Sequence, residues 1–209
     1  MGFSGFTRED FETFHIAGLD ERMAAIRERI QPKFQEIGEI LTADLTALVG
    51  DEMFLHIAKH ARRTKNPPND TWLALCHDKR GYKKHPHFQV GLFDDHVFIW
   101  LAYIYELPNK KEIAQTFLDN MDRIKTTVPD DFVISQDHTK KEAQSMADID
   151  LQQALERFRD VKKAEFLIGR HVDANDPVLK DGDKFLNLAT DTFKTLIPIY
   201  SLSFASDIL

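Results

Sequence analysis

Apolar residues at helical spacing dominate the first quarter of the sequence. From residue 19 to residue 48 they recur in steps of three or four, at Leu19, Met23, Ile26, Ile30, Phe34, Ile37, Leu41, Leu45 and Leu48. Residues at this spacing form one side of a helix, which has to be buried against another element. Pro32 interrupts the hydrogen bonding within this stripe, at a cost of about 3 kcal/mol unless the chain bends. We therefore expect a kinked helix, or two helices that meet at Pro32, with Gly50 as the C-terminal stop.

In the middle of the chain, the spacing of apolar residues is typical of β-strands instead of helices. The runs 53–58, 71–77 and 87–93 are rich in β-branched, aromatic and aliphatic residues at strand length. Two aspartates separate the last of them from the run 96–105, so these two runs predict a hairpin. The run 96–105 is apolar on both faces, which is typical of a central strand covered on both sides.

Helix and strand patterns alternate in the remainder of the chain. The predicted elements are a short strand at 12–16, a helix from Asn109 with a capping box to Glu112, a strand at 132–135, a helix at 151–161, a strand at 164–170 and a helix at 185–196 ended by Pro198. No repeat and no linker composition divides the chain. These patterns predict an α+β fold in one domain over 1–209, with a mainly antiparallel or mixed sheet packed against helices, including the long or Pro-kinked helix near 19–49.

Composition and the apolar runs narrow the cellular setting. Cys76 is the only cysteine, which excludes an intramolecular disulfide and a cysteine zinc cluster. The first ten residues lack the basic and apolar regions of a secretory signal. The most apolar run, 97–105, is too short to cross a bilayer as a helix. We therefore expect a cytoplasmic protein that does not enter membranes.

Charge is distributed unevenly along the chain. The net charge is −7, but the segment 56–88 carries eight Lys and Arg side chains against two aspartates, a net +6, which leaves −13 on the rest. Five of the nine histidines also lie in that segment. A basic, histidine-rich segment in an acidic chain favours a face that binds anions, and the alternative is a solvated surface whose lysines protect a sheet edge.

The first half of the basic segment reads HIAKHARRTKNPPNDTW. His56 and His60 are four residues apart, which places them on one face of a helix or of a strand. Arg62 and Arg63 precede a loop that two prolines make rigid. Arginines held in this way suit bidentate contact with carboxylate or phosphate. These four residues are candidates for ligand binding.

The second half of the basic segment reads KRGYKKHPHF. A turn at Gly81 is flanked by Arg80, Tyr82 and Lys83, and His87 follows at the start of a predicted strand. A tight turn with these side chains can cradle an anion or stack on a base. We add Arg80, Tyr82, Lys83 and His87 to the candidate ligand-binding residues.

Patterns for metal, triad and nucleotide-loop chemistry are incomplete. His56 and His60 have a metal-binding spacing, but an isoleucine stands where a metalloprotease has Glu, and no third ligand is near in sequence. We therefore predict no metal and no cofactor. Ser135, Asp137 and His138 are the residue types of a triad, but neighbours on a strand point to opposite faces, which favours a polar turn. No Gly-rich phosphate loop occurs.

The sequence resembles, in three blocks, the uncharacterised bacterial family typified by the Bacillus protein YktB. The blocks are HIAKHARRTKNPPNDTW (56–72), RGYKKHPHFQVG (80–91) and IYELPNK (104–110), and the likeness extends through KKAEFLIGR (162–170). The resemblance covers most of the chain and implies a cytosolic protein of low-GC Gram-positive bacteria with a compact α+β fold. It assigns no catalytic role to any residue, because the family has no established activity.

Three classes of function fit these observations. The first is binding of an anionic ligand, either a phosphorylated small molecule or nucleic acid, through the segment 56–88. The second is an enzyme that acts on a phosphorylated substrate, with His56, His60 or His87 as acid or base and arginines as anion clamps. The third is an interaction scaffold whose acidic remainder meets a basic partner. We rank anion binding first, and the sequence predicts no oligomeric state.

Overall fold

The strands form a single sheet in which every neighbouring pair is antiparallel. The computed structural model describes residues 2–205. In this range seven strands follow the spatial order β1-β2-β3-β4-β7-β5-β6. Their bounds are β1 (Phe54–Ile57), β2 (Thr71–Cys76), β3 (His87–Leu92), β4 (His96–Tyr103), β5 (Val133–Ser135), β6 (Gln144–Ser145) and β7 (Phe166–Asp173). The predicted hairpin joins β3 to β4, and β4 is buried along its whole length at the centre of the sheet, as expected.

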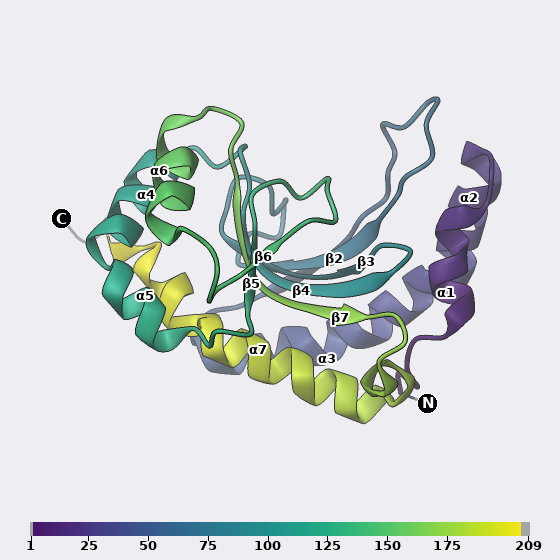
Figure 1. Cartoon of the computed structure of the whole chain (residues 1–209). Coiled ribbons are helices and arrows are strands. Elements are labelled where there is room, and N and C mark those ends of the chain that lie inside the picture. Colours follow the sequence, from purple (N-terminus) through teal and green to yellow (C-terminus); the bar gives the residue numbers. More distant parts are fainter. Residues whose placement is uncertain (1, 206–209) are drawn as a thin grey trace.

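Helices precede the sheet, interrupt it and close the chain. Their bounds are α1 (Arg8–Glu12), the 3₁₀ helix η1 (Thr13–His15), α2 (Leu19–Ala25), the π-helical turn η2 (Ile26–Ile30), α3 (Gln31–Val49), α4 (Lys110–Asp119), α5 (Met121–Thr127), α6 (Leu151–Asp160), the 3₁₀ helix η3 (Pro177–Lys180) and α7 (Gly182–Leu202). α4, α5 and α6 gather beyond one end of the sheet, whereas the β1–β2 connection projects beyond the other end, near α2 (Figure 1). The predicted α+β fold is confirmed.

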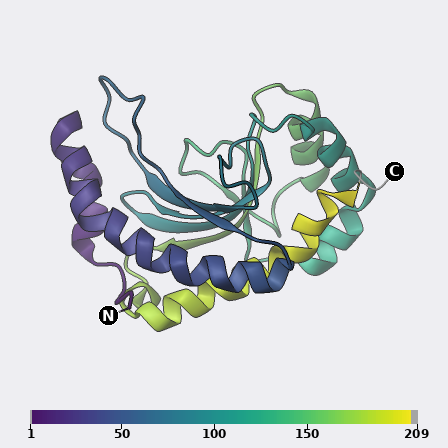
Figure 2. The same cartoon turned by 180° about the vertical axis from the view of Figure 1, so that it is seen from behind.

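α3 and α7 run side by side along one face of the sheet (Figure 2). The predicted apolar stripe of η2 and α3 forms part of the core, since its members from Ile26 to Leu45 are fully buried. Thr190 Oγ1 on α7 donates to Asp44 Oδ2 on α3 over 2.8 Å, which ties the two helices across 146 residues of sequence. Phe185 at the start of α7 packs on Phe3 and Phe6, so the N-terminal segment docks onto the last helix.

Helical structure is continuous from α2 to α3 despite Pro32. The backbone N–H of Gln31 donates to the carbonyl of Ile26, five residues back, which is the wider turn of a π-helix. This wider turn lies directly before the proline, which has no N–H of its own to donate. α3 ends at Gly50, whose φ of 79° is the left-handed conformation expected of a helix stop.

Alternation along the strands gives the sheet two different faces. Side chains such as Phe88, Val90 and Ile99 point to α3 and α7 and join the main core, and we call this side the helix face. The alternate residues form the opposite side, the loop face, where Phe98 and Trp100 belong to a separate small cluster. Register places His56, Ala74, Gln89 and Trp100 in one row across four neighbouring strands of the loop face.

Three local predictions were wrong. Residues 12–15 are helical and Ile16 is outside any strand, because a capping box of Thr7 and Asp10 starts α1 and the chain continues into η1. α7 passes through Pro198 to Leu202, because buried residues on both sides of the proline hold it against the sheet. Asn109 makes no side-chain cap; instead the buried Lys110 donates from Nζ to three backbone carbonyls at the end of α6, 2.6 to 3.1 Å away.

The helices of residues 2–205 include none that combines the length and the apolar composition needed to cross a membrane.

Candidate functional site

Asp78 organises the connection between β2 and β3. Its carboxylate accepts from the backbone N–H of Arg80 (2.7 Å) and lies 3.1 Å from Nε2 of His85. Nε2 of His56, on β1, is 2.9 Å from the Asp78 carbonyl. The Arg80 hydrogen bond, together with His85, holds the pKa of Asp78 below its ordinary value, although desolvation acts against this. The aspartate therefore keeps its charge and fixes the turn that carries the second half of the basic segment.

A groove that is open to solvent, here called the outer groove, lies between β1 and the β2–β3 connection. It has a volume of about 680 Å³. Its lining includes the cations Lys59, Arg80, Lys83 and Lys84, the acids Asp78 and Glu106, and the side chains of His56 and Tyr82. Lys83 Nζ pairs with Glu106 Oε1 at 3.4 Å, whereas within the described part of the chain the other three cations form no ion pair.

A smaller and more enclosed space, the inner cavity, adjoins the outer groove over the loop face. Its volume is about 80 Å³, and it is lined by Trp72, Tyr82, Lys83, Gln89, Ile104, Tyr105, Glu106 and His138. Tyr82, Lys83 and Glu106 line both spaces, so the groove and the cavity are neighbours that share these three side chains. The Trp72 indole N–H donates to the Tyr82 hydroxyl oxygen over 3.0 Å, which fixes two of the aromatic walls.

His87 lies beneath the inner cavity and orients Gln89. Burial lowers the pKa of His87 to about 4, so its ring is neutral at pH 7. Its Nδ1 is 2.8 Å from the His85 carbonyl oxygen, which can only accept, so Nδ1 carries the proton. Nε2 of His87 then accepts from the side-chain amide of Gln89 at 2.9 Å. Both ring nitrogens are therefore used within the protein.

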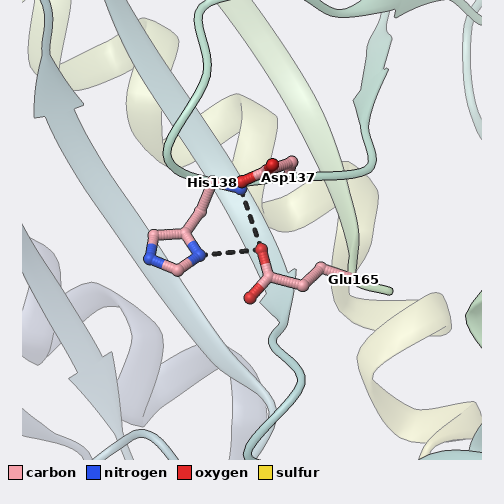
Figure 3. Close-up of side chains that lie close together, drawn as sticks. All are labelled: Asp137, His138 and Glu165. Carbon is pink, nitrogen blue, oxygen red and sulfur yellow. Dashed lines mark hydrogen bonds and ion pairs between the residues drawn. The ribbon is translucent and has the colours of Figure 1, made fainter. Parts of the chain in front are cut away.

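His138 and Glu165 form a buried pair that the sequence patterns did not reveal (Figure 3). The Glu165 carboxylate, 2% exposed, accepts from the backbone N–H of His138 at 2.8 Å and lies 2.7 Å from its Nδ1. Burial lowers the pKa of His138, but the hydrogen bond and charge of Glu165, helped by Asp70 and Asp137, leave it above its ordinary value. Nε2 is on the side of the ring away from Glu165 (Figure 3), and His138 lines the inner cavity.

Asp70, beside this pair, is a second buried acid. Burial raises the pKa of Asp70 to about 6, although His138 and Arg63 act in the opposite direction. Carboxylates and imidazoles with shifted pKa values that lie beside a cavity are typical of proton-transfer sites. His138 lines the inner cavity, whereas Asp70 lines neither the cavity nor the outer groove.

One group of side chains has the spacing of a metal site. Asp137, His138 and Glu165 each place a potential ligand atom within 4.8 Å of the others. However, His138 and Glu165 already hydrogen-bond to each other, and Asp137 Oδ1 accepts from the backbone and hydroxyl of Thr139. Asp137 points away from the pair in Figure 3. A metal would have to replace these hydrogen bonds, so the donor set fits a polar network better.

The β1–β2 connection, which carries His60, Arg62 and Arg63, lies at the other end of β2. The β1–β2 connection is held by the buried Arg22, which donates to the Pro68 carbonyl at 2.8 Å and contacts Asn69. His60 has a positive φ of 49°, stacks its edge on Trp72 and contacts Thr71 Oγ1. Burial, assisted by Arg63, lowers the pKa of His60 to about 4.

The structure brings together half of the predicted site residues. His56, Arg80, Tyr82 and Lys83 line the outer groove. His60, Arg62, Arg63 and His87 do not line it. Arg62 and Arg63 are exposed on the β1–β2 connection, so the length of β2 separates these two arginines from Arg80 and Lys83. For the missed His138–Glu165 pair, the available signal was a charged residue at the start of the apolar run 164–168, because such a residue needs a partner when it is buried.

Comparison with known proteins places the chain in a bacterial family. Residues 6–200 match the family described as "Domain of unknown function (DUF1054)". A UPF0637 protein of Shouchella clausii is 63% identical over 203 residues, covering 97% of this chain and 96% of the relative. UPF0637 proteins of Oceanobacillus iheyensis and Listeria monocytogenes are 61% and 53% identical, over 97% of this chain and 98% and 99% of the relatives. The expected resemblance is confirmed, and the chain belongs to the DUF1054 family.

Proposed function

We propose that the outer groove binds a small anionic ligand that carries phosphate. The observation that supports this most directly is the presence of Lys59, Arg80 and Lys84 on one open groove without carboxylate partners among residues 2–205. Unpaired cations gathered in a concave site attract and orient phosphate oxygens. The volume of about 680 Å³ lies in the range of small-molecule sites. A small molecule suits the site better than nucleic acid, because the chain as a whole carries −7.

A thermal-shift screen with phosphorylated sugars, nucleotides and pyrophosphate tests this proposal. A ligand at about 100 times its dissociation constant adds roughly 2.7 kcal/mol, which raises the melting temperature of a chain this size by about 5–10 °C. We expect the Arg80→Ala, Lys84→Ala double variant to lose most of that shift. Arg62→Ala is the matched control, since Arg62 is an exposed arginine of the same basic segment that does not line the groove. A full shift in the double variant would refute the proposal.

A second candidate function is catalysis on the same phosphorylated ligand. His138 supports it, because Glu165 holds Nδ1 while the ring lines the inner cavity beside the groove. A carboxylate-oriented imidazole is a common general acid or base. This favours His138 over His87, whose two ring nitrogens are both hydrogen-bonded within the protein, and over His60, which lines neither the groove nor the cavity.

Turnover of a phosphoester that binds in the screen distinguishes catalysis from binding alone. We expect His138→Gln to lower kcat by about 10²–10⁴-fold while the ligand still produces its thermal shift. Equal kcat in His138→Gln and the parent protein would exclude His138 as the acid or base.

A further inference from the structure

Gln89 presents a fixed amide to the inner cavity. Its side chain is only 4% exposed and lies on β3, near the middle of the loop face. One of its N–H groups is committed to Nε2 of His87, whose own proton is committed to the His85 carbonyl. The hydrogen bond to His87 therefore fixes the orientation of the Gln89 amide. Its Oε1 has no hydrogen-bond partner among residues 2–205 and is not sealed off from solvent, so this oxygen can accept a hydrogen bond from a ligand in the cavity.

Aromatic side chains enclose this amide. Trp72, Tyr82 and Tyr105 line the same cavity. Because the Tyr82 hydroxyl already accepts from Trp72 Nε1, its own proton remains available for a ligand. Aromatic walls around a single oriented amide suit a flat heteroaromatic ring, which stacks on the walls and hydrogen-bonds along one edge.

A nucleobase has the edge that this amide requires. Each nucleobase carries a hydrogen-bond donor beside an acceptor, and the amide of Gln supplies the matching acceptor and donor, as in its bidentate contact with adenine. The inner cavity, at about 80 Å³, admits the edge of one planar ring and not a stack of bases. The rest of the molecule would lie in the outer groove, which shares Tyr82, Lys83 and Glu106 with the cavity.

We propose that the ligand is a mononucleotide whose base enters the inner cavity and hydrogen-bonds with Gln89, while its phosphate lies among Lys59, Arg80 and Lys84. This inference rests on the proposed function, because it names the class of the same anionic ligand. The phosphate contacts supply attraction and the Gln89 amide supplies selectivity for the base. A phosphorylated sugar makes only the first set of contacts and binds more weakly.

Calorimetric titration of the full-length protein with AMP, GMP, CMP, UMP and ribose 5-phosphate tests the inference. We expect at least one nucleotide to bind roughly tenfold more tightly than ribose 5-phosphate, which corresponds to one good bidentate base contact. In Gln89→Leu this preference should nearly vanish. Gln31→Leu is the matched control, because the Gln31 amide donates one hydrogen bond within the protein, to the Ala58 carbonyl, but lies outside both the groove and the cavity.

The outcomes separate this inference from the proposed function. Equal affinity of the parent protein for all four nucleotides and for ribose 5-phosphate would overturn base recognition and leave phosphate binding intact. A nucleotide preference that persists in a folded Gln89→Leu protein would overturn the role of Gln89. Absence of binding by every probe at millimolar concentration would overturn both proposals. The comparison of ligands on the parent protein decides base recognition even if Gln89→Leu fails to fold.

Discussion

The two faces of the sheet are built from alternate residues of the same strands, yet they differ in almost every property. On β3, Phe88 and Val90 are fully buried against the helices, whereas His87 and Gln89 turn to the loop face and form a hydrogen-bonded relay. The helix face contains apolar side chains packed on α3 and α7. The loop face holds most of the buried polar groups of the site. Because the strand period is two, one short strand contributes to both, and substitutions one residue apart should have unrelated effects.

Phe88→Ala should show the largest effect. The Phe88 ring packs at 4.9 Å from Phe193 and 5.1 Å from Tyr200, both on α7. Removing it should lower the free energy of unfolding by about 3–5 kcal/mol, as measured by urea denaturation. The adjacent Gln89→Leu removes one buried hydrogen bond and should cost about 1–3 kcal/mol. Equal losses in the two variants would contradict the division between faces.

Acid should destabilise the protein through histidines of the loop face. Burial is the main cause that lowers the pKa of His60 and His87 to about 4 and of His171 to about 3. Below pH 6.5 the unfolded chain binds protons that the folded protein does not, so the free energy of unfolding falls as pH falls. Each histidine contributes up to about 1.4 kcal/mol per pH unit. Asp70, with a folded pKa of about 6, acts oppositely between about pH 4 and 6 and cancels about one histidine.

For these three histidines and Asp70 together, we expect a loss of up to about 3 kcal/mol per pH unit between pH 6 and pH 5. Urea unfolding at pH 5, 6 and 7 measures it, and His171→Gln should flatten the curve. A stability that is constant over this range would show that these histidines are not buried as described.

Glu165→Gln should reveal the opposite pH dependence within the same face. The pKa of His138 is raised in the folded protein, so the pair stabilises the fold below pH 6.5 and this contribution is lost as pH rises through the folded pKa. We expect the variant to lose about 1–3 kcal/mol at pH 6 and less at pH 9. NMR titration of His138 should show a lower pKa in the variant. A loss of unfolding free energy that does not depend on pH would mean that the pair stabilises the fold by packing and not through the charge on His138.

Gly91→Ala tests how closely the aromatic side chains of the loop face approach the backbone. A Cβ at Gly91 would overlap the Phe98 ring and the Thr71 carbonyl oxygen. We expect a loss of about 1–3 kcal/mol from overpacking. Gly81→Ala serves as the control, because nothing lies near a Cβ at that position, and its effect should stay within about 0.5 kcal/mol.

Local pattern predicted the helix face well and the loop face poorly. The stripe from Leu19 to Leu48 and the four runs between 53 and 105 are continuous in sequence, so periodicity located α3 and the strands β1 to β4. Pro198 and residues 12–16 were misjudged because tertiary packing and a helix cap outweighed local preference. The spacing of apolar residues and the lengths of the apolar runs are therefore enough to locate α3 and the strands β1 to β4.

The candidate site depends on residues that meet only in the folded chain. His138 and Glu165 are 27 residues apart, and Trp72 meets Tyr82 across the β2–β3 connection. Of the candidate ligand-binding residues in the basic segment, His56, Arg80, Tyr82 and Lys83 line one groove. It also suggested Arg62 and Arg63, but charge counting cannot reveal that antiparallel pairing sends these two arginines to the end of β2 opposite Arg80.

The side-by-side packing of α3 and α7 has a consequence for synthesis on the ribosome. α3 is complete at Val49, but α7 ends only at Leu202. At a translation rate of about 5–20 residues per second, roughly 8–30 s pass between completion of α3 and completion of α7. β7, which pairs with the central strand β4, also arrives late. Nascent chains that stop before α7 should therefore expose the part of the helix face over β4 and β7 that α7 covers, and should depend on chaperones until the last helix is released.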